Sequence, residues 1–330
     1  RRGRRGARQR HGPRLTLRAG GAHKAGIVSD PGFVHSVQAI SCMHDVLLCG
    51  RFELSLRSPL VMGIVNTTPD SFSDGGQHAH ADAAIAHARA LVDAGAHILD
   101  IGGESTRPGA PPVPAADEAA RVLPVLEGLR DVGVPLSVDT YKPEVMRAAL
   151  DAGADMLNDI RGFTDPAAIA VATAHGRCGV VAMHMKGQPQ TMQATEPVYQ
   201  DVVAEVTQWL SQRCQTLLAQ GVGARRIVLD PGFGFGKTTE QNYALLARLQ
   251  SLRALGFPVL AGVSRKSMIG NVTGRAVDQR LAGSLAAMLG AVARGAAIVR
   301  VHDVAQTVDA LAVWQAIEGT KIEGTKGDRA

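Results

Sequence analysis

The chain has 330 residues, 45% of them hydrophobic and 20% charged, with a formal net charge of +5. This length is enough for one large core, such as an α/β barrel of about 250 residues. Four scattered cysteines without a Cys-x-x-Cys pair favour neither a zinc site nor a disulfide framework, and they suit a reducing, cytoplasmic compartment. No apolar run approaches the roughly 18 residues of a membrane span, so we expect no membrane partner.

The positive charge is concentrated at the N-terminus. Residues 1–42 hold nine Lys and Arg against one acid, whereas the remainder has 26 of the 35 bases and 29 of the 30 acids. A polyanion would therefore meet only the tail, and we expect no nucleic-acid partner. Because Met43 is the first methionine and strand patterns begin just after it, we expect residues 1–42 to be a disordered basic extension or to precede the true start. An organellar transit peptide is the alternative.

The pattern of elements begins after Met43. Val46–Leu48 and Phe52–Leu56 predict a short hairpin that plugs the bottom of a barrel. Helical patterns end at glycines and alternate with eight almost wholly apolar runs that are typical of strands. These runs are Leu60–Val65, His97–Ile101, Leu136–Val138, Asp155–Leu157, Gly179–Met183, Arg226–Leu229, Pro258–Ala261 and Ile298–Val301.

Apolar strands joined by helices indicate a parallel sheet covered on its outer face, and eight of them predict a (β/α)8 TIM barrel over residues 43–317. The competing fold is an open doubly wound sheet, but its G-x-G-x-x-G fingerprint is absent after the first strand. A repeated Glu-Gly-Thr-Lys marks residues 318–330 as a flexible polar tail.

Every strand-like run is followed by polar residues. In a barrel the carboxyl ends of the strands converge on one mouth, so these residues become neighbours whatever their distance in sequence. In chain order they are Asn66, Asp100 with Glu104, Asp139, Asn158 with Asp159, His184 with Lys186, Asp230, Ser264-Arg265-Lys266, and Arg300 with His302.

Four of these residues predict a flat heterocyclic ligand. Asp139 and Asp230 offer charged acceptors, Asn158 both donates and accepts, and Lys266 supplies a cation. Pterins and guanine present a complementary edge of amine, N–H, carbonyl and ring nitrogen. The alternative interpretation is that Lys266 only neutralises two buried aspartates.

The last two strands predict an anion site. Ser264, Arg265, Arg300 and His302 lie where barrels commonly bind phosphate. Asn66 has an amide oxygen suited to Mg²⁺, which uses one or two protein ligands together with substrate phosphates. We interpret Asn66, Mg²⁺ and a diphosphate as one assembly, with Asn66 capping its own turn as the alternative. The glycine-rich loops 68–76 and 102–109 suit lids that exclude water, or are ordinary surface loops.

The ordered motifs NTTPDSFSDGG, DIGGESTRPGA, SVDTYKP, ND, LDPGFGFGK, SRKSMIG and RVHDV resemble those of dihydropteroate synthases over about Val46–Ile317. Thr67 stands where that family often has valine. The resemblance implies a cytoplasmic, commonly homodimeric transferase of folate biosynthesis. Its reaction condenses (7,8-dihydropterin-6-yl)methyl diphosphate with 4-aminobenzoate, which gives 7,8-dihydropteroate and diphosphate.

The resemblance also implies roles for individual residues. It places the pterin on Asp139, Asn158, Asp230 and Lys266, and Mg²⁺ on Asn66. Leaving-group charge would be stabilised by Arg300 and His302, and the pterin cation by Asp139 and Asp74. The remaining implied substrate contacts are Thr106, Met183 and Val301, with Phe72, Arg107, Pro108, Phe235 and Ser267 around 4-aminobenzoate.

Other functions are compatible with the same barrel. A pterin-dependent methyltransferase would share the pterin contacts but needs no diphosphate site, and this chain has no Asp-x-His-x-x-Gly cobalamin signature. A Schiff-base aldolase would use Lys266 as its nucleophile. An inactive pterin-binding paralogue would bind the substrate without releasing diphosphate. For the dimer, the helical apolar face of Leu281, Leu285, Met288, Leu289 and Val292 is the predicted contact.

Overall fold

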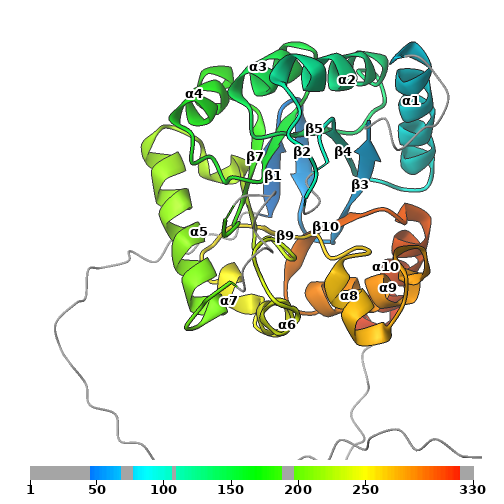
Figure 1. Ribbon diagram of the computed structural model, residues 1–330, viewed down its shortest axis with the longest axis vertical. Helices are drawn as coiled ribbons and strands as arrows, with labels where there is room; N and C mark the ends of the chain where they lie inside the picture. Colours follow the sequence, from blue (N-terminus) through cyan, green and yellow to red (C-terminus); the bar gives the residue numbers. More distant parts are fainter. Residues whose placement is uncertain (1–44, 68–76, 106–108, 188–196, 320–330) are drawn as a thin grey trace, which may run out of the picture. The chain divides into compact units, whose positions relative to one another are not determined.

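The computed structural model describes residues 45–67, 77–105, 109–187 and 197–319. In these residues eight parallel strands close into one barrel in the order β10-β3-β4-β5-β6-β7-β8-β9, so the predicted (β/α)8 fold is confirmed (Figure 1). The strands are β3 (Leu60–Asn66), β4 (Ile98–Gly102), β5 (Leu136–Asp139), β6 (Met156–Asp159), β7 (Gly179–Met183), β8 (Ile227–Asp230), β9 (Val259–Ala261) and β10 (Ala296–Val301).

The strands include the polar residues at their carboxyl ends. Asp139 is the last residue of β5, where it pairs with Gly102 on one side and with Asn158 on the other. Asp230 ends β8 opposite Met183. Because the hydrogen-bond ladder fixes the backbone at these positions, the side chains of Asp139 and Asp230 are held by the sheet, whereas His184, Lys266 and His302 follow the ends of their strands.

Helices cover the outside of the barrel (Figure 1). Gly95, Gly153, Gly221 and Gly295, predicted to terminate helices, all have positive φ, between 91° and 109°. Such a left-handed residue lets a helix end and the chain turn back toward the next strand. The helices are α1 (Gln77–Asp93), α2 (Ala115–Gly128), α3 (Pro143–Asp151), α4 (Pro166–His175), α5 (Val202–Ala219), α6 (Thr239–Ala247), α7 (Gln250–Arg253), α8 (Ser267–Thr273), α9 (Leu281–Val292) and α10 (Val304–Gly319), with short 3₁₀ turns η2 (Ala224–Arg226) and η3 (Val277–Gln279).

The hydrophobic core has two parts. The larger part lies between the strands and the helices. The smaller one contains inward-facing residues of the strands, including Met62, Met156 and Leu260, together with Leu47 and Cys49 of the N-terminal hairpin. The hairpin, β1 (Val46–Cys49) and β2 (Phe52–Ser55), therefore completes the interior of the barrel, as the sequence predicted.

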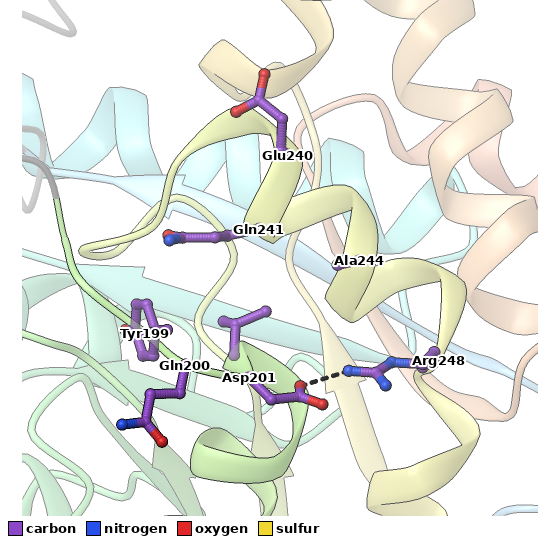
Figure 2. A pocket seen from close by; sticks show the side chains of 8 residues that line it. Tyr199, Gln200, Asp201, Glu240, Gln241, Ala244 and Arg248 are labelled. Carbon is purple, nitrogen blue, oxygen red and sulfur yellow. Dashed lines mark hydrogen bonds and ion pairs between the residues drawn. The ribbon is translucent and has the colours of Figure 1, made fainter. Parts of the chain in front are cut away.

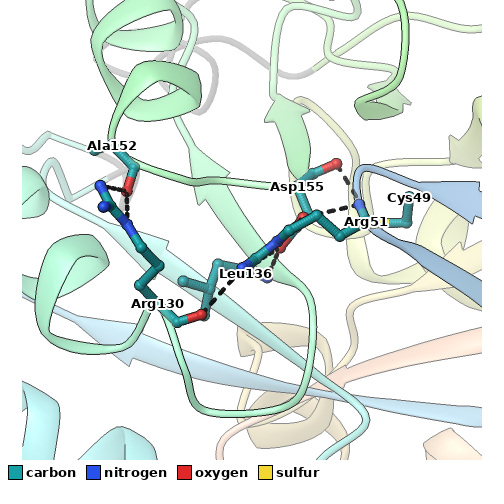
Figure 3. A network of polar contacts seen from close by, with 6 residues as sticks. All are labelled: Cys49, Arg51, Arg130, Leu136, Ala152 and Asp155. Atoms are coloured by element: carbon teal, nitrogen blue, oxygen red, sulfur yellow. Dashed lines mark hydrogen bonds and ion pairs between the residues drawn. The ribbon is translucent and has the colours of Figure 1, made fainter.

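Arg51 in the hairpin turn attaches the hairpin to the barrel (Figure 3). Its Nε and NH2 groups donate to the two carboxylate oxygens of Asp155, each at 3.0 Å, and its NH1 group donates to the Arg130 carbonyl at 3.1 Å. Asp155 precedes β6 and also accepts from the Leu136 backbone N–H at 3.2 Å. One carboxylate therefore joins the hairpin to the starts of two neighbouring strands.

Some predictions fall on residues that the structure does not describe. Phe72, Asp74, Thr106, Arg107 and Pro108 lie outside the described residues, as do the N-terminal extension 1–42 and most of the C-terminal tail. Among the described helices, none is both long and apolar enough to cross a membrane.

Candidate functional site

Two carboxylates at the mouth of the barrel share one guanidinium. Arg300 on β10 donates from Nε to Asp100 on β4 at 2.5 Å and from NH2 to Asp139 on β5 at 2.7 Å. Asp100 is fully buried, and the Arg300 side chain is 22% exposed. Asp139 and Asp100 precede Arg300 by 161 and 200 positions in the sequence. The three side chains nevertheless meet at the carboxyl ends of their strands, as predicted for the strand tips.

Asp100 is the centre of this network. Its Oδ1 accepts from Ser137 Oγ at 2.6 Å, and its Oδ2 accepts from Asn158 Nδ2 at 3.1 Å in addition to Arg300. The amide of Asn158, whose orientation is set by this bond, is itself buried. The predicted ligand residues Asp139 and Asn158 are therefore connected through Asp100 and Arg300. We call these four residues, together with Ser137, the Asp100 network.

Asp139 keeps one unsatisfied oxygen. Its Oδ1 is buried without a hydrogen-bond partner among the described residues. Burial raises the pKa of Asp139 well above its usual range, the Arg300 guanidinium opposes this, and the nearby Asp100 adds to it. Burial disfavours the guanidinium too, but Asp100 and Asp139 outweigh it and raise the pKa of Arg300. The site thus holds more negative than positive charge, with one acceptor open to a ligand.

Asp230 and Lys266 form the second charged pair of the mouth. Asp230 Oδ1 accepts from the Gly232 backbone N–H at 2.7 Å. Burial raises the pKa of Asp230, and Lys266 is the largest opposing influence. Burial likewise lowers the pKa of Lys266 to about 8, against the attraction of Asp230. The ammonium also donates to the Phe233 carbonyl and lies 4.7 Å from the centre of the Phe235 ring.

The segment from Gly232 to Lys237, between β8 and α6, carries those two phenylalanines. Lys237 is buried, and its Nζ contacts the carbonyls of Gly232 at 2.8 Å and Phe235 at 3.0 Å and Nδ1 of His184 at 3.1 Å. Burial lowers the pKa of Lys237 to about 7, although Asp230 favours its charged form. Burial also lowers the pKa of His184 to about 3, so this imidazole is neutral, and its Nδ1 accepts from Lys237 in the tautomer that carries the proton on Nε2.

The residues predicted to bind an anion have other partners in this structure. Ser264 Oγ lies 3.0 Å from His302 Nδ1. Arg265, with φ of 57°, forms a bidentate pair with Asp303. Arg300 contacts the two carboxylates described above. The structure therefore brings Ser264, Arg300 and His302 to the same mouth, and the anion site itself stays a prediction.

A lysine between two glutamates fixes the start of the segment that follows β4. Lys142 Nζ donates to both Glu104 and Glu118. Glu104 also accepts from the Tyr141 hydroxyl at 3.3 Å and from the Val113 backbone N–H at 3.3 Å. Glu104 was predicted as a polar tip, and here it connects the residues on both sides of segment 106–108.

Asn66 is the predicted magnesium ligand. It is exposed at the carboxyl end of β3, and an amide oxygen is a group that Mg²⁺ accepts. Within the described ranges, no group of three or more His, Cys, Asp or Glu is placed to hold a metal ion. Asn66 could supply one oxygen ligand, and a Mg²⁺ ion at this position stays a prediction.

A hollow of about 320 Å³ lies between the start of α5 and α6 (Figure 2). It is lined by Tyr199, Asp201, Glu240 and Arg248 among others, and an ion pair of 2.5 Å joins Asp201 to Arg248 across it. None of the predicted site residues lines this hollow. The chemistry-bearing side chains gather at the strand ends and not here.

Three functional features were not assigned from the sequence. Asp100 was recognised as a polar tip but given no role, and Ser137 and Lys237 were not singled out. A serine at the second position of a short apolar strand, and a lysine that closes a Gly-x-Gly-x-Gly segment, are the only local signals.

Met183 is buried at the end of β7, Val301 is buried on β10, and Ser267 is exposed at the start of α8.

Comparisons with known proteins agree with this geometry. A family model described as pterin binding enzyme matches residues 62–302. The dihydropteroate synthase of Neisseria meningitidis serogroup B is 52% identical over 274 residues, which cover 81% of this chain and 96% of the relative.

Two solved structures extend the comparison. The dihydropteroate synthase of Xanthomonas albilineans with 4-aminobenzoic acid superposes with a TM-score of 0.79 at 53% identity, covering 84% of this chain and 99% of the other. The Burkholderia cenocepacia enzyme complexed with 7,8-dihydropteroate has a TM-score of 0.76 at 55% identity, covering 83% and 96%.

Proposed function

This chain belongs to the pterin binding enzyme family and, within it, to the dihydropteroate synthases, and on that premise we propose how its own residues perform the synthase reaction. The reaction condenses (7,8-dihydropterin-6-yl)methyl diphosphate with 4-aminobenzoate and releases diphosphate. The observation that carries the proposal is the pair of charged groups at one mouth, the Asp100 network and the Asp230–Lys266 pair.

The pterin ring is held by hydrogen bonds that these groups leave open. The amine and N–H edge of the ring donates to Asp230, which accepts one backbone N–H through Oδ1. Lys266 donates to the ring carbonyl and ring nitrogen, and Asn158 contacts the ring from β6. Asp139 Oδ1, buried and without a partner among the described residues, accepts from the ring N–H that faces it.

The chemical step separates charge. The C–O bond between the pterin methylene and the diphosphate breaks, and its electron pair leaves with the diphosphate. The electron-rich ring delocalises the resulting cation, and the excess negative charge of Asp139 and Asp100 over Arg300 stabilises it. The arylamine nitrogen then attacks the methylene and loses its proton. No strong base is required, because the electrophile is already cationic.

Arg300 and His302 stabilise the leaving diphosphate in this proposal. Arg300 binds two carboxylates in the described structure. To contact the diphosphate, it keeps its bond to one carboxylate and replaces the bond to the other by a bond to the anion. When bound, Mg²⁺ neutralises phosphate charge. Asn66 would hold it through the amide oxygen. Asp74 and Thr106 lie outside the described residues and keep their proposed roles beside the cation and the substrate.

The 4-aminobenzoate pocket is assigned to the side of Lys266 where α8 begins. Phe235 presents its ring there, and Ser267 is the first residue of the helix. Met183 and Val301 form buried walls on β7 and β10. Phe72, Arg107 and Pro108, outside the described residues, complete this pocket in the proposal.

Diphosphate release tests the activity directly. The protein is incubated with the dihydropterin diphosphate, with and without 4-aminobenzoate, and both diphosphate and dihydropteroate are measured. An active synthase forms the two in equal amounts, and adding EDTA lowers the rate. Calorimetric binding of the pterin diphosphate without diphosphate release would instead identify an inactive paralogue. An Asn66→Ala variant should need more Mg²⁺ for half-maximal rate, and an unchanged requirement would contradict the role of Asn66.

We also propose a homodimer, formed through a surface that shares only Leu281 with the predicted one. Met288 and Val292 of the predicted α9 face are buried within the subunit, and Leu281 is its one exposed member. Exposed apolar residues occur on the neighbouring helices α9 and α10: Leu281 at the start of α9, and Val313 and Ile317, 63% and 64% exposed, in the second half of α10. Ile317→Glu should give monomers by sedimentation, whereas Val198→Glu on the far segment before α5 should not.

A further inference from the structure

Lys237 is a buried cation that the proposed reaction does not use. Its side chain is surrounded by four acceptors: the carbonyls of Gly232, Phe235 and His184 at 2.8, 3.0 and 3.3 Å, and His184 Nδ1 at 3.1 Å. No donor faces it among these contacts, and an ammonium has three N–H groups to give. Two of the carbonyls belong to the segment after β8 and one to the end of β7.

Given the synthase function above, we propose that Lys237 is a positioning residue for the arylamine pocket. It holds the segment Gly232–Lys237, which we call the β8 loop, in the one conformation that presents the Phe233 carbonyl and the Phe235 ring to Lys266. Lys237 acts through these groups and does not touch the substrate.

Phe233 anchors the β8 loop in the hydrophobic core, but two glycines bring the backbone of the loop directly against the end of β7. Gly232 has φ of 67°, and a Cβ there would lie 1.9 Å from the His184 carbonyl oxygen. Gly236 has φ of 60°, and a Cβ there would lie 2.2 Å from the Lys186 carbonyl oxygen. The backbone therefore approaches the end of β7 without intervening side chains, and its inward carbonyls need a donor. Lys237 is that donor.

Two other side chains support the same loop from outside. The Tyr199 hydroxyl donates to the Gly236 carbonyl at 3.0 Å, and Asn242 Oδ1 accepts from the Gly234 N–H at 2.7 Å. Tyr199 makes one bond to the loop and Asn242 makes two, the second from Nδ2 to the Lys237 carbonyl at 3.3 Å, but of these three side chains only Lys237 bonds the backbone of Phe235. Its removal is therefore expected to displace Phe235 further than removal of either neighbour.

The first test replaces Lys237 by the near-isosteric methionine. Steady-state kinetics of Lys237→Met should show a KM for 4-aminobenzoate raised about tenfold and a KM for the pterin diphosphate changed less than about threefold. Lys186→Met is the control, because Lys186 is exposed just beyond β7 and its ammonium contacts the Val198 carbonyl, Glu205 and the Tyr199 ring, all outside the β8 loop. Equal changes in both KM values, or no change in either, would overturn the proposal.

A double-mutant cycle with Phe235→Ala tests whether Lys237 acts through that ring. If it does, Lys237→Met should change the 4-aminobenzoate KM less than about twofold in the Phe235→Ala background. If the factors by which the two substitutions raise this KM simply multiply in the double variant, the role of Phe235 is refuted. If Lys237→Met does not fold, Tyr199→Phe decides: it keeps the ring, removes one bond to the loop, and should raise the same KM about two- to threefold, with no rise counting against the proposal. A wild-type protein without diphosphate release would defeat the proposed function instead.

Discussion

Lys266 is expected to lower the free energy of unfolding of the protein. Burial lowers its pKa to about 8, from about 10.5 in an unfolded chain. Below pH 8 this difference corresponds to about 3 kcal/mol by which the charged lysine destabilises the folded state. Lys266→Met removes that penalty but leaves the Phe233 carbonyl without its donor, which costs about 1–2 kcal/mol. At pH 7 the variant should therefore unfold with a free energy about 1–2 kcal/mol higher than the wild type, while turnover falls at least about tenfold.

The pH dependence of the difference separates this explanation from simple repacking. Between pH 8 and 10.5 the folded wild type has released the Lys266 proton and the unfolded chain still binds it, so wild-type stability rises with pH. The methionine variant lacks this contribution, so over this range the difference between the two proteins follows mainly the Lys266 proton. Urea unfolding followed by circular dichroism should show the advantage of the variant at pH 7 shrinking to zero or below by pH 10.5. A variant that is less stable at pH 7, or a difference independent of pH, would refute the reasoning.

Four further substitutions, one of them a control, probe the network and the hairpin. Asp139→Asn keeps the shape of the side chain but removes its charge, and the rate of diphosphate release should fall at least about tenfold. Ser137→Ala removes a donor at 2.6 Å from buried Asp100, and urea unfolding should show a loss of about 1–2 kcal/mol. Arg51→Met breaks the bidentate pair of the hairpin, which should cost about 1–3 kcal/mol without a change in either KM. Arg57→Met, which breaks a 3.8 Å pair of exposed side chains in the same hairpin region, should cost less than about 0.5 kcal/mol.

The fold could be predicted because its strands are buried on both faces. Each appears as an apolar run between helical patterns, and β7 has the predicted bounds, Gly179–Met183. Most other strands extend one or two residues further toward the mouth than their apolar runs. The physical reason is that hydrogen bonding to neighbouring strands, and not hydrophobicity, determines where a strand ends: Asp139 stays in the ladder between Gly102 and Asn158 despite its charge.

The sequence predicted which residues the site contains, but not which of them form hydrogen bonds or ion pairs with one another. That strand tips converge follows from topology, so Asp139, Asn158, Asp230 and Lys266 could be expected together. Which residue Arg300 contacts depends on how its side chain crosses the mouth, and strand order does not encode this. Lys237 escaped prediction for a related reason, because three of its four acceptors are backbone carbonyls whose positions depend on the folded loop.

The charges at the mouth have a common physical logic. Asp100 and Asp139 share one guanidinium, so the Asp100 network carries one negative charge in excess when both are ionised, and burial raises the pKa of Asp139 to about 7. Lys266, a buried cation, is held beside Asp230 and bonded to a carbonyl. Neither arrangement is the most stable choice for a protein interior, since a buried charge without a complete set of partners is costly. A flat ring that donates to the carboxylates and accepts from the lysine would supply the missing partners of both groups. Its attraction to the carboxylates is greatest when the diphosphate has departed, because the ring is then cationic. The free-energy cost of burying these charges and the stabilisation of the reacting ring are therefore two consequences of the same side chains.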